Sequence, residues 1–238
     1  VEVPMPFLVA IVLLWGACWG SFLNVVIYRL PAGLSVVHPS SHCPACQAPI
    51  RPWQNIPLLS WAFLGGRCAK CNIPISFRYP AVEAVTAGLA LAVALPWLTA
   101  WLQGDLAAPD AYGGLLLEHC LLFALIAIAL IDADTFMVPD SLSLPMPLVG
   151  IAVAFWLGDA RGVSWQQAAA GALAGGGGLL AVQLGYAALT GREGLGTGDV
   201  KLMAGLGAWL GVSALPIVQL AAAIQGLIFA VGLTLVQR

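Results

Sequence analysis

The chain has 238 residues, of which 61% are hydrophobic and only 8% are charged, and its mean hydropathy is +0.94. Soluble domains contain roughly 25% charged residues, so this composition excludes an ordinary soluble domain and predicts an integral membrane protein with the lipid bilayer as its partner. The formal net charge of −2 and the lack of a basic run argue against a nucleic-acid partner.

The first apolar run, within residues 1–28, has no positively charged leader and no small-residue cleavage site, so we interpret it as a retained helix rather than a signal peptide. About 20 mostly apolar residues span a bilayer. The fold class expected is therefore an all-α polytopic membrane protein with about seven transmembrane helices and a small zinc-ribbon-like loop. The predicted spans are residues 4–28, 81–101, 112–131, 140–158, 166–190, 200–215 and 216–237.

The longest connection between predicted helices, residues 29–80, contains five of the nine basic residues. Cytoplasmic loops carry an excess of Lys and Arg, so this distribution places the loop in the cytoplasm. Alternating the later helices then puts two acidic segments, IDADTFMVPD and GLGTGDVK, on the same side of the membrane. The predicted span at 200–215 is the weakest, because sixteen residues cover roughly 24 Å of a hydrocarbon core about 30 Å thick.

Two Cys-x-x-Cys pairs lie in the loop, at Cys43 and Cys46 and at Cys68 and Cys71. Four thiolates suit a tetrahedral zinc ion, and paired knuckles at this spacing are typical of structural zinc sites. The alternative is a pair of disulfides, which the inferred cytoplasmic location disfavours. His42 could replace one thiolate, although we expect it to be a bystander.

Asp132 lies at the end of one apolar segment, and Asp199 lies at the beginning of another. Both residues are predicted to lie at the same membrane depth. Two close carboxylates at a low-dielectric site can share one proton and act as general base and general acid on a peptide bond. Gly196 and Gly198 leave room for a substrate backbone beside Asp199. Lys201, two residues further on, is expected to anchor its helix at the headgroups.

Other polar residues have competing interpretations. Asp134 and Asp140 are rivals of Asp132, with Asp134 also a supporting residue and Asp140 a candidate helix cap. Glu118 and His119 lie toward the other end of their helix, where we expect a polar packing role. Gly171 and Gly175, and likewise Gly207 and Gly211, are four residues apart, which indicates close helix–helix packing.

A specific resemblance emerges from the order of the motifs along the chain: GSFLNVVIYRLP, the two Cys-x-x-Cys pairs, FRYPAVEAVTAGL, IDADTFMVPD and GTGDVKLMAGLGAWLG. Together they resemble the bacterial type IV prepilin peptidase family, also called leader peptidase/N-methyltransferase, over nearly the whole chain. GxGD alone is less specific, because presenilin-like proteases share it. The family pattern continues into a further apolar helix with an IPFGP-like segment, whereas this chain ends at LVQR.

The resemblance implies an intramembrane aspartyl endopeptidase of the inner membrane. Such enzymes remove the leader from type IV prepilins or type II secretion pseudopilins at the cytoplasmic face and methylate the new N-terminus with S-adenosylmethionine. The family's aspartates fall on Asp132 and Asp199, and its zinc-type cysteines fall on the four named above. The parts expected are a first helix (1–28), a zinc-binding loop with a methyltransferase region (29–80) and a bundle with the protease site (81–238).

No Gly-rich cofactor loop is recognisable, so the residues that would bind the methyl donor are unknown; Asn24 and Glu83 are candidates, with structural roles at least as plausible. The alternative function is a small membrane transporter or metal-permeation protein that uses acidic residues at helix ends. Against it, the chain shows neither a repeated half nor a matched pair of broken helices.

Overall fold

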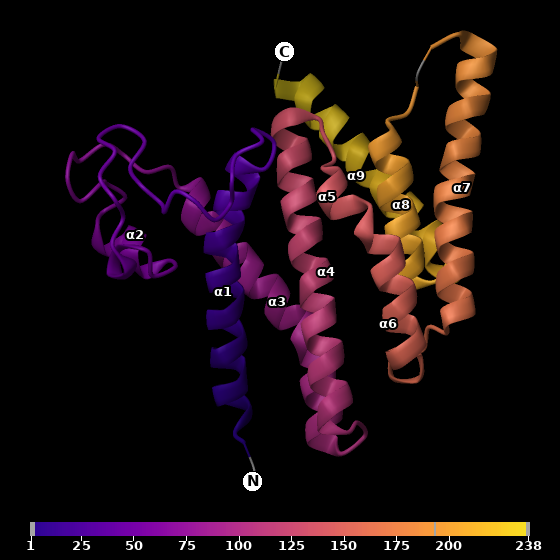
Figure 1. The fold of residues 1–238 in the computed structure, drawn as a ribbon, viewed down its shortest axis with the longest axis horizontal. Helices are drawn as coiled ribbons and strands as arrows, with labels where there is room; N and C mark the ends of the chain where they lie inside the picture. Colours follow the sequence, from indigo (N-terminus) through magenta and orange to yellow (C-terminus); the bar gives the residue numbers. More distant parts are fainter. Residues whose placement is uncertain (1–2, 193, 237–238) are drawn as a thin grey trace. The chain divides into compact units, whose positions relative to one another are not determined.

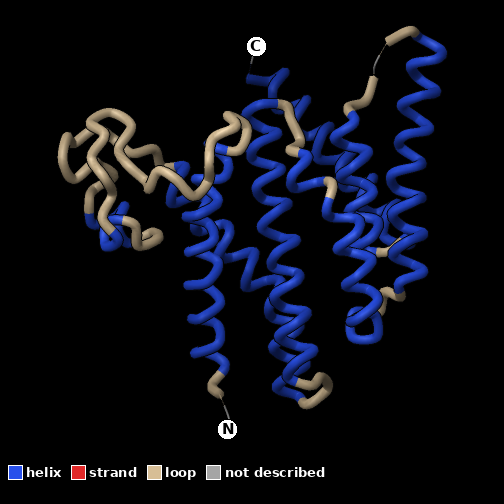
Figure 2. Tube along the Cα trace, in the orientation of Figure 1, coloured by secondary structure: helices blue, strands red, loops and turns tan. Residues whose placement is uncertain are grey.

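Helices dominate the part of the chain that this computed structural model describes, residues 3–192 and 194–236 (Figures 1 and 2). Within those residues no strand is formed, and two isolated β-bridges join His42 with Pro49 and Arg67 with Pro74. The chain divides into two units, Val1–Pro139 and Asp140–Arg238. The predicted all-α fold class is therefore confirmed.

The first unit contains three long helices and the connection between the first two. α1 (Met5–Arg29) packs against α3 (Arg78–Gln103), and α4 (Ala108–Thr135) packs against both. Gly16 and Gly20 allow α1 to approach α3, because a Cβ on either would lie 2.7 Å from a backbone Cα of α3. This pair of small residues at four-residue spacing follows the same packing rule as the pairs predicted elsewhere.

Two polar side chains of α4 hold it to α3. Glu118 accepts a hydrogen bond from Trp97 Nε1 at 2.8 Å, and His119 Nε2 lies 3.1 Å from the carbonyl oxygen of Ala90. His119 is only 1% exposed. The predicted packing role of Glu118 and His119 is thus confirmed, since a buried polar group is stable only when it has such a partner.

The second unit is built around α8 and its neighbours. Its elements are α5 (Asp140–Ser143), α6 (Pro145–Arg161), α7 (Trp165–Thr190), α8 (Thr197–Leu210), the 3₁₀ turn η2 (Val212–Ala214) and α9 (Leu215–Val236). α7 and α8 approach most closely at Gly171 and Gly207, where a Cβ on either glycine would lie 2.1 Å from the other's carbonyl oxygen. Close packing at these small residues, predicted from their spacing, is confirmed.

We expect Gly171→Leu to destabilise the second unit by about 3 kcal/mol or more, because the backbone of α8 occupies the space that the side chain needs. The measurement is thermal unfolding of the purified protein in detergent. Gly177→Leu is the matched control on the same helix, since nothing lies within 4 Å of a Cβ at Gly177. Equal losses from the two variants would contradict this account of α7 and α8.

In the part of the chain that the structure describes, six helices are long and apolar enough to cross a membrane. The exception among the seven predicted spans is the one at 200–215, which corresponds to α8: its 14 residues cover only about 21 Å. Gly211, with φ of +79°, ends α8, and η2 then separates it from α9.

Large apolar side chains point outward from the long helices. Leu14 is 61% exposed, Trp156 78% and Leu189 89%. Such an exterior is unfavourable in water and is what a lipid environment requires. The chain is therefore a multi-pass membrane protein.

Candidate functional site

Four cysteine thiols gather in the connection between α1 and α3. The Sγ atoms of Cys43, Cys46, Cys68 and Cys71 all lie within 4.8 Å of one another. Cys43 Sγ is 3.7 Å from Cys71 Sγ, and Cys46 Sγ is 4.0 Å from Cys68 Sγ. A tetrahedral ion with metal–sulfur bonds of about 2.3 Å places its ligands roughly 3.8 Å apart. The cluster therefore has the donors and the spacing of a tetrahedral metal site.

The two alternatives for this cluster do not match the geometry. All four cysteines are free, and the Sγ–Sγ distances of 3.7 Å and 4.0 Å between the knuckles are far longer than a disulfide bond of about 2.05 Å. His42 Nδ1 lies 3.0 Å from the carbonyl oxygen of Ser40, and His42 is not part of the four-ligand group. The predicted set of four thiols is thus brought together as one cluster.

The two knuckles have the same backbone structure. In each, the N–H of the first cysteine donates to the carbonyl five residues later at 2.9 Å. The N–H four residues after that cysteine donates back to its carbonyl, at 2.9 Å in the first knuckle and 3.0 Å in the second. The residue after the second cysteine has a positive φ in both cases, 56° at Gln47 and 57° at Asn72. The sequence contains the pattern C-x-x-C-(Q/N)-x-P-I twice. This repeat could have predicted that the two knuckles have the same backbone structure.

Backbone N–H groups favour the thiolate form at the first cysteine of each knuckle. Hydrogen bonds from the N–H groups of Cys71 and Lys70 lower the pKa of the Cys68 thiol to about 6. The N–H groups of Cys46 and Ala45 likewise lower the pKa of Cys43. Because metals bind the thiolate, this local structure favours metal binding at Cys43 and Cys68, whereas desolvation and the neighbouring thiols raise the pKa of Cys71 to about 12.

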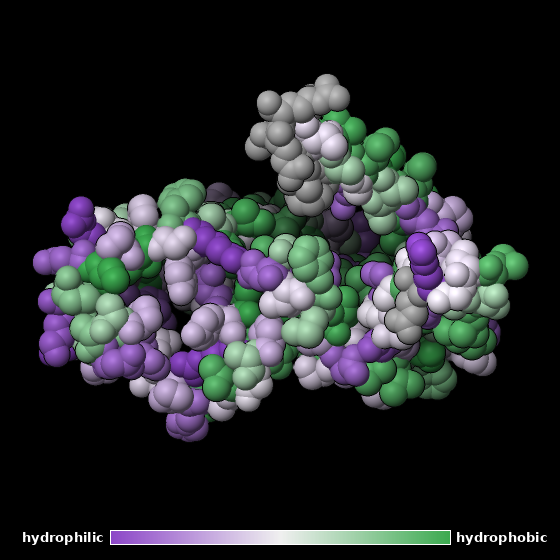
Figure 3. Space-filling view, turned by 90° about the horizontal axis from the view of Figure 1, so that it is seen from above, coloured by the Kyte–Doolittle hydropathy of each residue, from purple (hydrophilic) through white to green (hydrophobic). Residues whose placement is uncertain are grey.

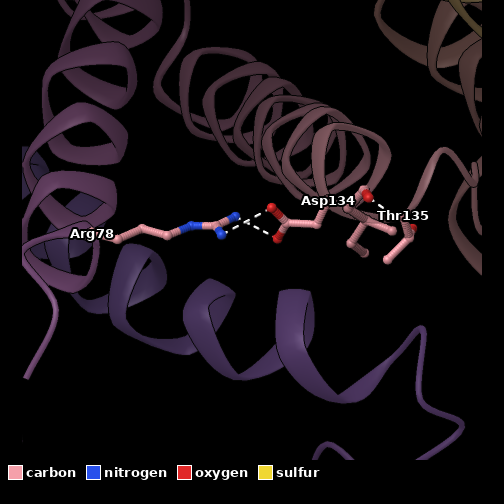
Figure 4. A network of polar contacts seen from close by, with 4 residues as sticks. Arg78, Asp134 and Thr135 are labelled. Carbon is pink, nitrogen blue, oxygen red and sulfur yellow. Dashed lines mark hydrogen bonds and ion pairs between the residues drawn. The ribbon is translucent and has the colours of Figure 1, made fainter.

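The acids at the end of α4 have different surroundings. Asp134 forms a two-fold ion pair with Arg78 at the start of α3, with N–O distances of 2.9 and 2.6 Å (Figure 4). Asp132 is exposed, and among the described residues no hydrogen bond or ion pair engages its carboxylate. Asp134 thus joins α3 to α4, whereas Asp132 is available for another partner.

We expect the pair of Arg78 and Asp134 to couple only weakly in stability, by about 0.2–1 kcal/mol, because the side chains are 45% and 40% exposed. A double-mutant cycle with Arg78→Gln and Asp134→Asn, read by unfolding free energy, measures this coupling. The coupling should fall further at high salt. A coupling of several kcal/mol that salt does not change would contradict this expectation.

A second ion pair lies in the other acidic region. Lys201, in the second turn of α8, donates to Asp140 at the start of α5. The Lys201 ammonium therefore binds a carboxylate within the protein, in addition to any role at the headgroups. Asp140, expected as a helix cap or as a rival of Asp132, is engaged by this pair.

Asp199 lies at the third position of α8, whose N-cap residue is Gly196. It is exposed, and its carboxylate has no hydrogen-bond or ion-pair partner among the described residues. A Cβ on Gly196 would lie 3.5 Å from Asp199 Oδ2, in ordinary contact. Gly196 therefore lies directly beside this carboxylate.

Asp132 belongs to the first unit and Asp199 to the second. Each lies near a helix end in its own unit and has no partner among the described residues, and their convergence stays a prediction. The two rivals, Asp134 and Asp140, are each bound to a basic residue. This difference separates the candidate catalytic acids from the structural ones.

Asn24 and Glu83, considered for methyl-donor binding, make structural contacts. Asn24 Nδ2 donates to the carbonyl oxygens of Gly20 and Tyr79, both at 3.2 Å. Glu83 is 8% exposed and accepts a hydrogen bond from the Leu58 N–H at 2.7 Å. Asn24 thus joins α1 to the first turn of α3, and Glu83 fastens the connection to α3.

Comparison with known proteins places these features in a family. Residues 14–97 match the bacterial peptidase A24 N-terminal domain, and residues 119–231 match the type IV leader peptidase family. No solved structure gives a significant match.

Several curated relatives are similar along most of their length. The prepilin leader peptidase/N-methyltransferase of Neisseria gonorrhoeae is 38% identical over 95% of this chain and 82% of its own. That of Aeromonas hydrophila is 40% identical over 96% of this chain and 82% of its own, and that of Pseudomonas aeruginosa is 38% identical over 96% and 81%. At this identity and coverage, the chain belongs to the type IV leader peptidase family.

Proposed function

We propose that this chain is an intramembrane aspartyl endopeptidase that removes the leader from type IV prepilins or type II secretion pseudopilins. The observation that carries the proposal is that Asp132 and Asp199 have no partner among the described residues, in a chain of the type IV leader peptidase family. The neighbouring acids are bound to basic residues. The family assignment gives no support to the transporter alternative.

The chemistry follows from two carboxylates that share one proton. The ionised carboxylate removes a proton from a water molecule, which attacks the carbonyl carbon of the scissile peptide bond. The protonated carboxyl group donates a hydrogen bond to the carbonyl oxygen and then supplies the proton for the leaving nitrogen. Asp132 and Asp199 take these two roles, in the pattern of the aspartic proteases.

Several supporting residues have defined parts in this proposal. Gly196 and Gly198 keep the start of α8 narrow where the substrate backbone approaches Asp199. Lys201 holds α8 to α5 through Asp140, and Asp134 holds the end of α4 to α3 through Arg78. These two ion pairs fix the helix ends on which the catalytic acids lie.

We further propose that residues 29–80 hold a structural zinc ion on the cytoplasmic side of the inner membrane. Four thiols within 4.8 Å of one another support zinc, and the presence of five of the nine basic residues in this segment supports the cytoplasmic side. Bound S-adenosylmethionine would supply an electrophilic methyl group for the new N-terminal amine, as the names of the relatives imply. Residues 81–238 would carry the protease site.

The test uses the purified full chain in lipid nanodiscs with a prepilin and methyl-labelled S-adenosylmethionine. We expect release of the leader and label on the new N-terminal residue. Cleavage without label would limit the proposal to the peptidase. Absence of cleavage, together with ion flux in proteoliposomes, would overturn it in favour of a transporter.

A further inference from the structure

The connection between α1 and α3 does not extend straight away from the ends of these helices. In Figure 1 it turns back, so that α2 (Leu59–Phe63) lies level with the upper part of α1 rather than beyond its end. Both ends of the connection continue directly into helices long enough to cross a membrane. The segment is therefore held at the bilayer surface by its own chain.

Hydrogen bonding places the start of α2 at a definite depth along both helices. The N–H of Leu58 donates to Glu83 Oε2 at 2.7 Å. Glu83 is five residues inside α3, or about 7 Å along its axis. A Cβ on Gly20 would lie 2.7 Å from Glu83 Cα, and Gly20 is nine residues, about 13 Å, before the end of α1. α2 thus begins beside the parts of these helices that cross the membrane.

One face of α2 is fixed to the rest of the connection. Ser60 is buried, and its Oγ accepts from the Ile56 N–H and donates to the Trp53 carbonyl. Trp61 Nε1 donates to the Ile75 carbonyl at 3.2 Å, and the Trp61 ring packs edge-on against Phe77. These contacts determine which way α2 faces.

The opposite face of α2 is apolar and uncovered. Leu59, Ala62 and Phe63 follow the i, i+3, i+4 spacing of one helix face, and all three are exposed. Leu59 is 55% exposed and Phe63 is 86% exposed. A phenylalanine side chain this exposed, next to helices that cross the membrane, requires an apolar partner that is permanently in contact with the protein.

The charge of the segment selects that partner. Between Arg29 and Glu83 there is no acidic residue, and the basic residues from Arg29 onward are Arg29, Arg51, Arg67, Lys70 and Arg78. The Arg51 guanidinium lies 5.4 Å from the ring of Trp53, which is 62% exposed. Hydrophilic residues gather over this part of the upper face, at the left of Figure 3. Basic side chains with exposed aromatic residues are typical of contact with anionic lipid headgroups.

We propose that α2 is an interfacial helix that inserts Leu59, Ala62 and Phe63 into the adjacent lipid leaflet. Glu83 holds its first turn at the level of the boundary between headgroups and acyl chains, and Arg51, Arg67 and Lys70 meet the headgroups. The cysteine cluster lies on the same connection, so the metal site is held at the membrane surface rather than free in the aqueous phase. This assignment does not depend on the peptidase activity.

The first test is labelling by phospholipids that carry a photoactivatable diazirine in the acyl chain, with the full-length protein in nanodiscs that contain phosphatidylglycerol. We expect carbene adducts on residues 59–63 at a level similar to Leu14, an exposed residue of α1. Adducts there should exceed those on knuckle residues 44–47 by about ten-fold. Labelling of Leu14 without labelling of 59–63 would overturn the proposal.

The second test compares Phe63→Asp with Val37→Asp, a matched control because Val37 is an exposed apolar residue (67%) of the same connection but lies outside α2. Phe63→Asp should remove the adducts on 59–63 and raise oxidation of Trp53 by aqueous hydroxyl radicals several-fold, while Val37→Asp leaves both unchanged. Equal effects of the two variants would overturn the proposal. Protection of α2 that depends on protein concentration would do so too, since it would show a second copy on this face.

Discussion

Replacing either Asp132 or Asp199 with asparagine is expected to lower leader cleavage by about 10³-fold or more, because each carboxylate has a separate part in the proton transfers. Cleavage of a purified prepilin, followed by mass change under single-turnover conditions, is the measurement. Neither variant should lose stability, since both side chains are exposed and neither has a partner among the described residues.

Asp134→Asn and Asp140→Asn are the matched controls for these variants. Each makes the same chemical change at a nearby acid and removes an exposed or half-exposed ion pair, so cleavage should stay within about ten-fold of wild type. Thermal unfolding of all four variants shows whether each is folded. Near wild-type cleavage by Asp132→Asn or Asp199→Asn would show that the wrong acids have been assigned.

Replacing Cys68 with serine is expected to reduce the bound metal from about one ion per chain to nearly none, because three thiolates do not complete a tetrahedral site. The connection should then become sensitive to protease, since its short helices and two isolated bridges offer little other support. Elemental analysis and timed proteolysis of residues 30–77 measure the two effects. Cys18→Ser serves as the control, because Cys18 is a free cysteine of α1 outside the cluster.

The metal prediction has a clear opposite outcome. Wild-type protein that contains no metal after purification without chelators, and in which the four thiols are oxidised, would support the disulfide alternative. A metal other than zinc would keep the cluster as a metal site and correct only the identity of the ion.

Local patterns predicted much of this molecule. Apolar runs of sufficient length correspond to the six long helices, and the two Cys-x-x-Cys pairs correspond to one cluster of thiols. Glycines four residues apart identified the contact of α7 with α8. Each of these features depends on residues close in sequence or on a composition that only a membrane tolerates.

Features that depend on distant residues were not predictable in the same way. The partners of Asp134 and Asp140 are 56 and 61 residues away in the chain, and no local pattern connects them. The predicted span at 140–158 is confirmed as the membrane-capable segment Asp140–Gly158, but within it α5 ends before α6 begins at Pro145. A proline is favoured in a first helical turn and disfavoured within a helix, so this boundary could have been placed from the sequence.

The four clustered thiols also have a consequence for the chain between them. An ion bound there would act as a cross-link across the twenty-one residues that separate the knuckles. Closing a flexible loop of that length costs about 3 kcal/mol of conformational entropy. The binding energy of the ion would offset this cost in place of a hydrophobic core. α2 lies inside this closed loop, so a bound ion would restrict the motion of α2. Removal of the ion by chelation would remove that restraint.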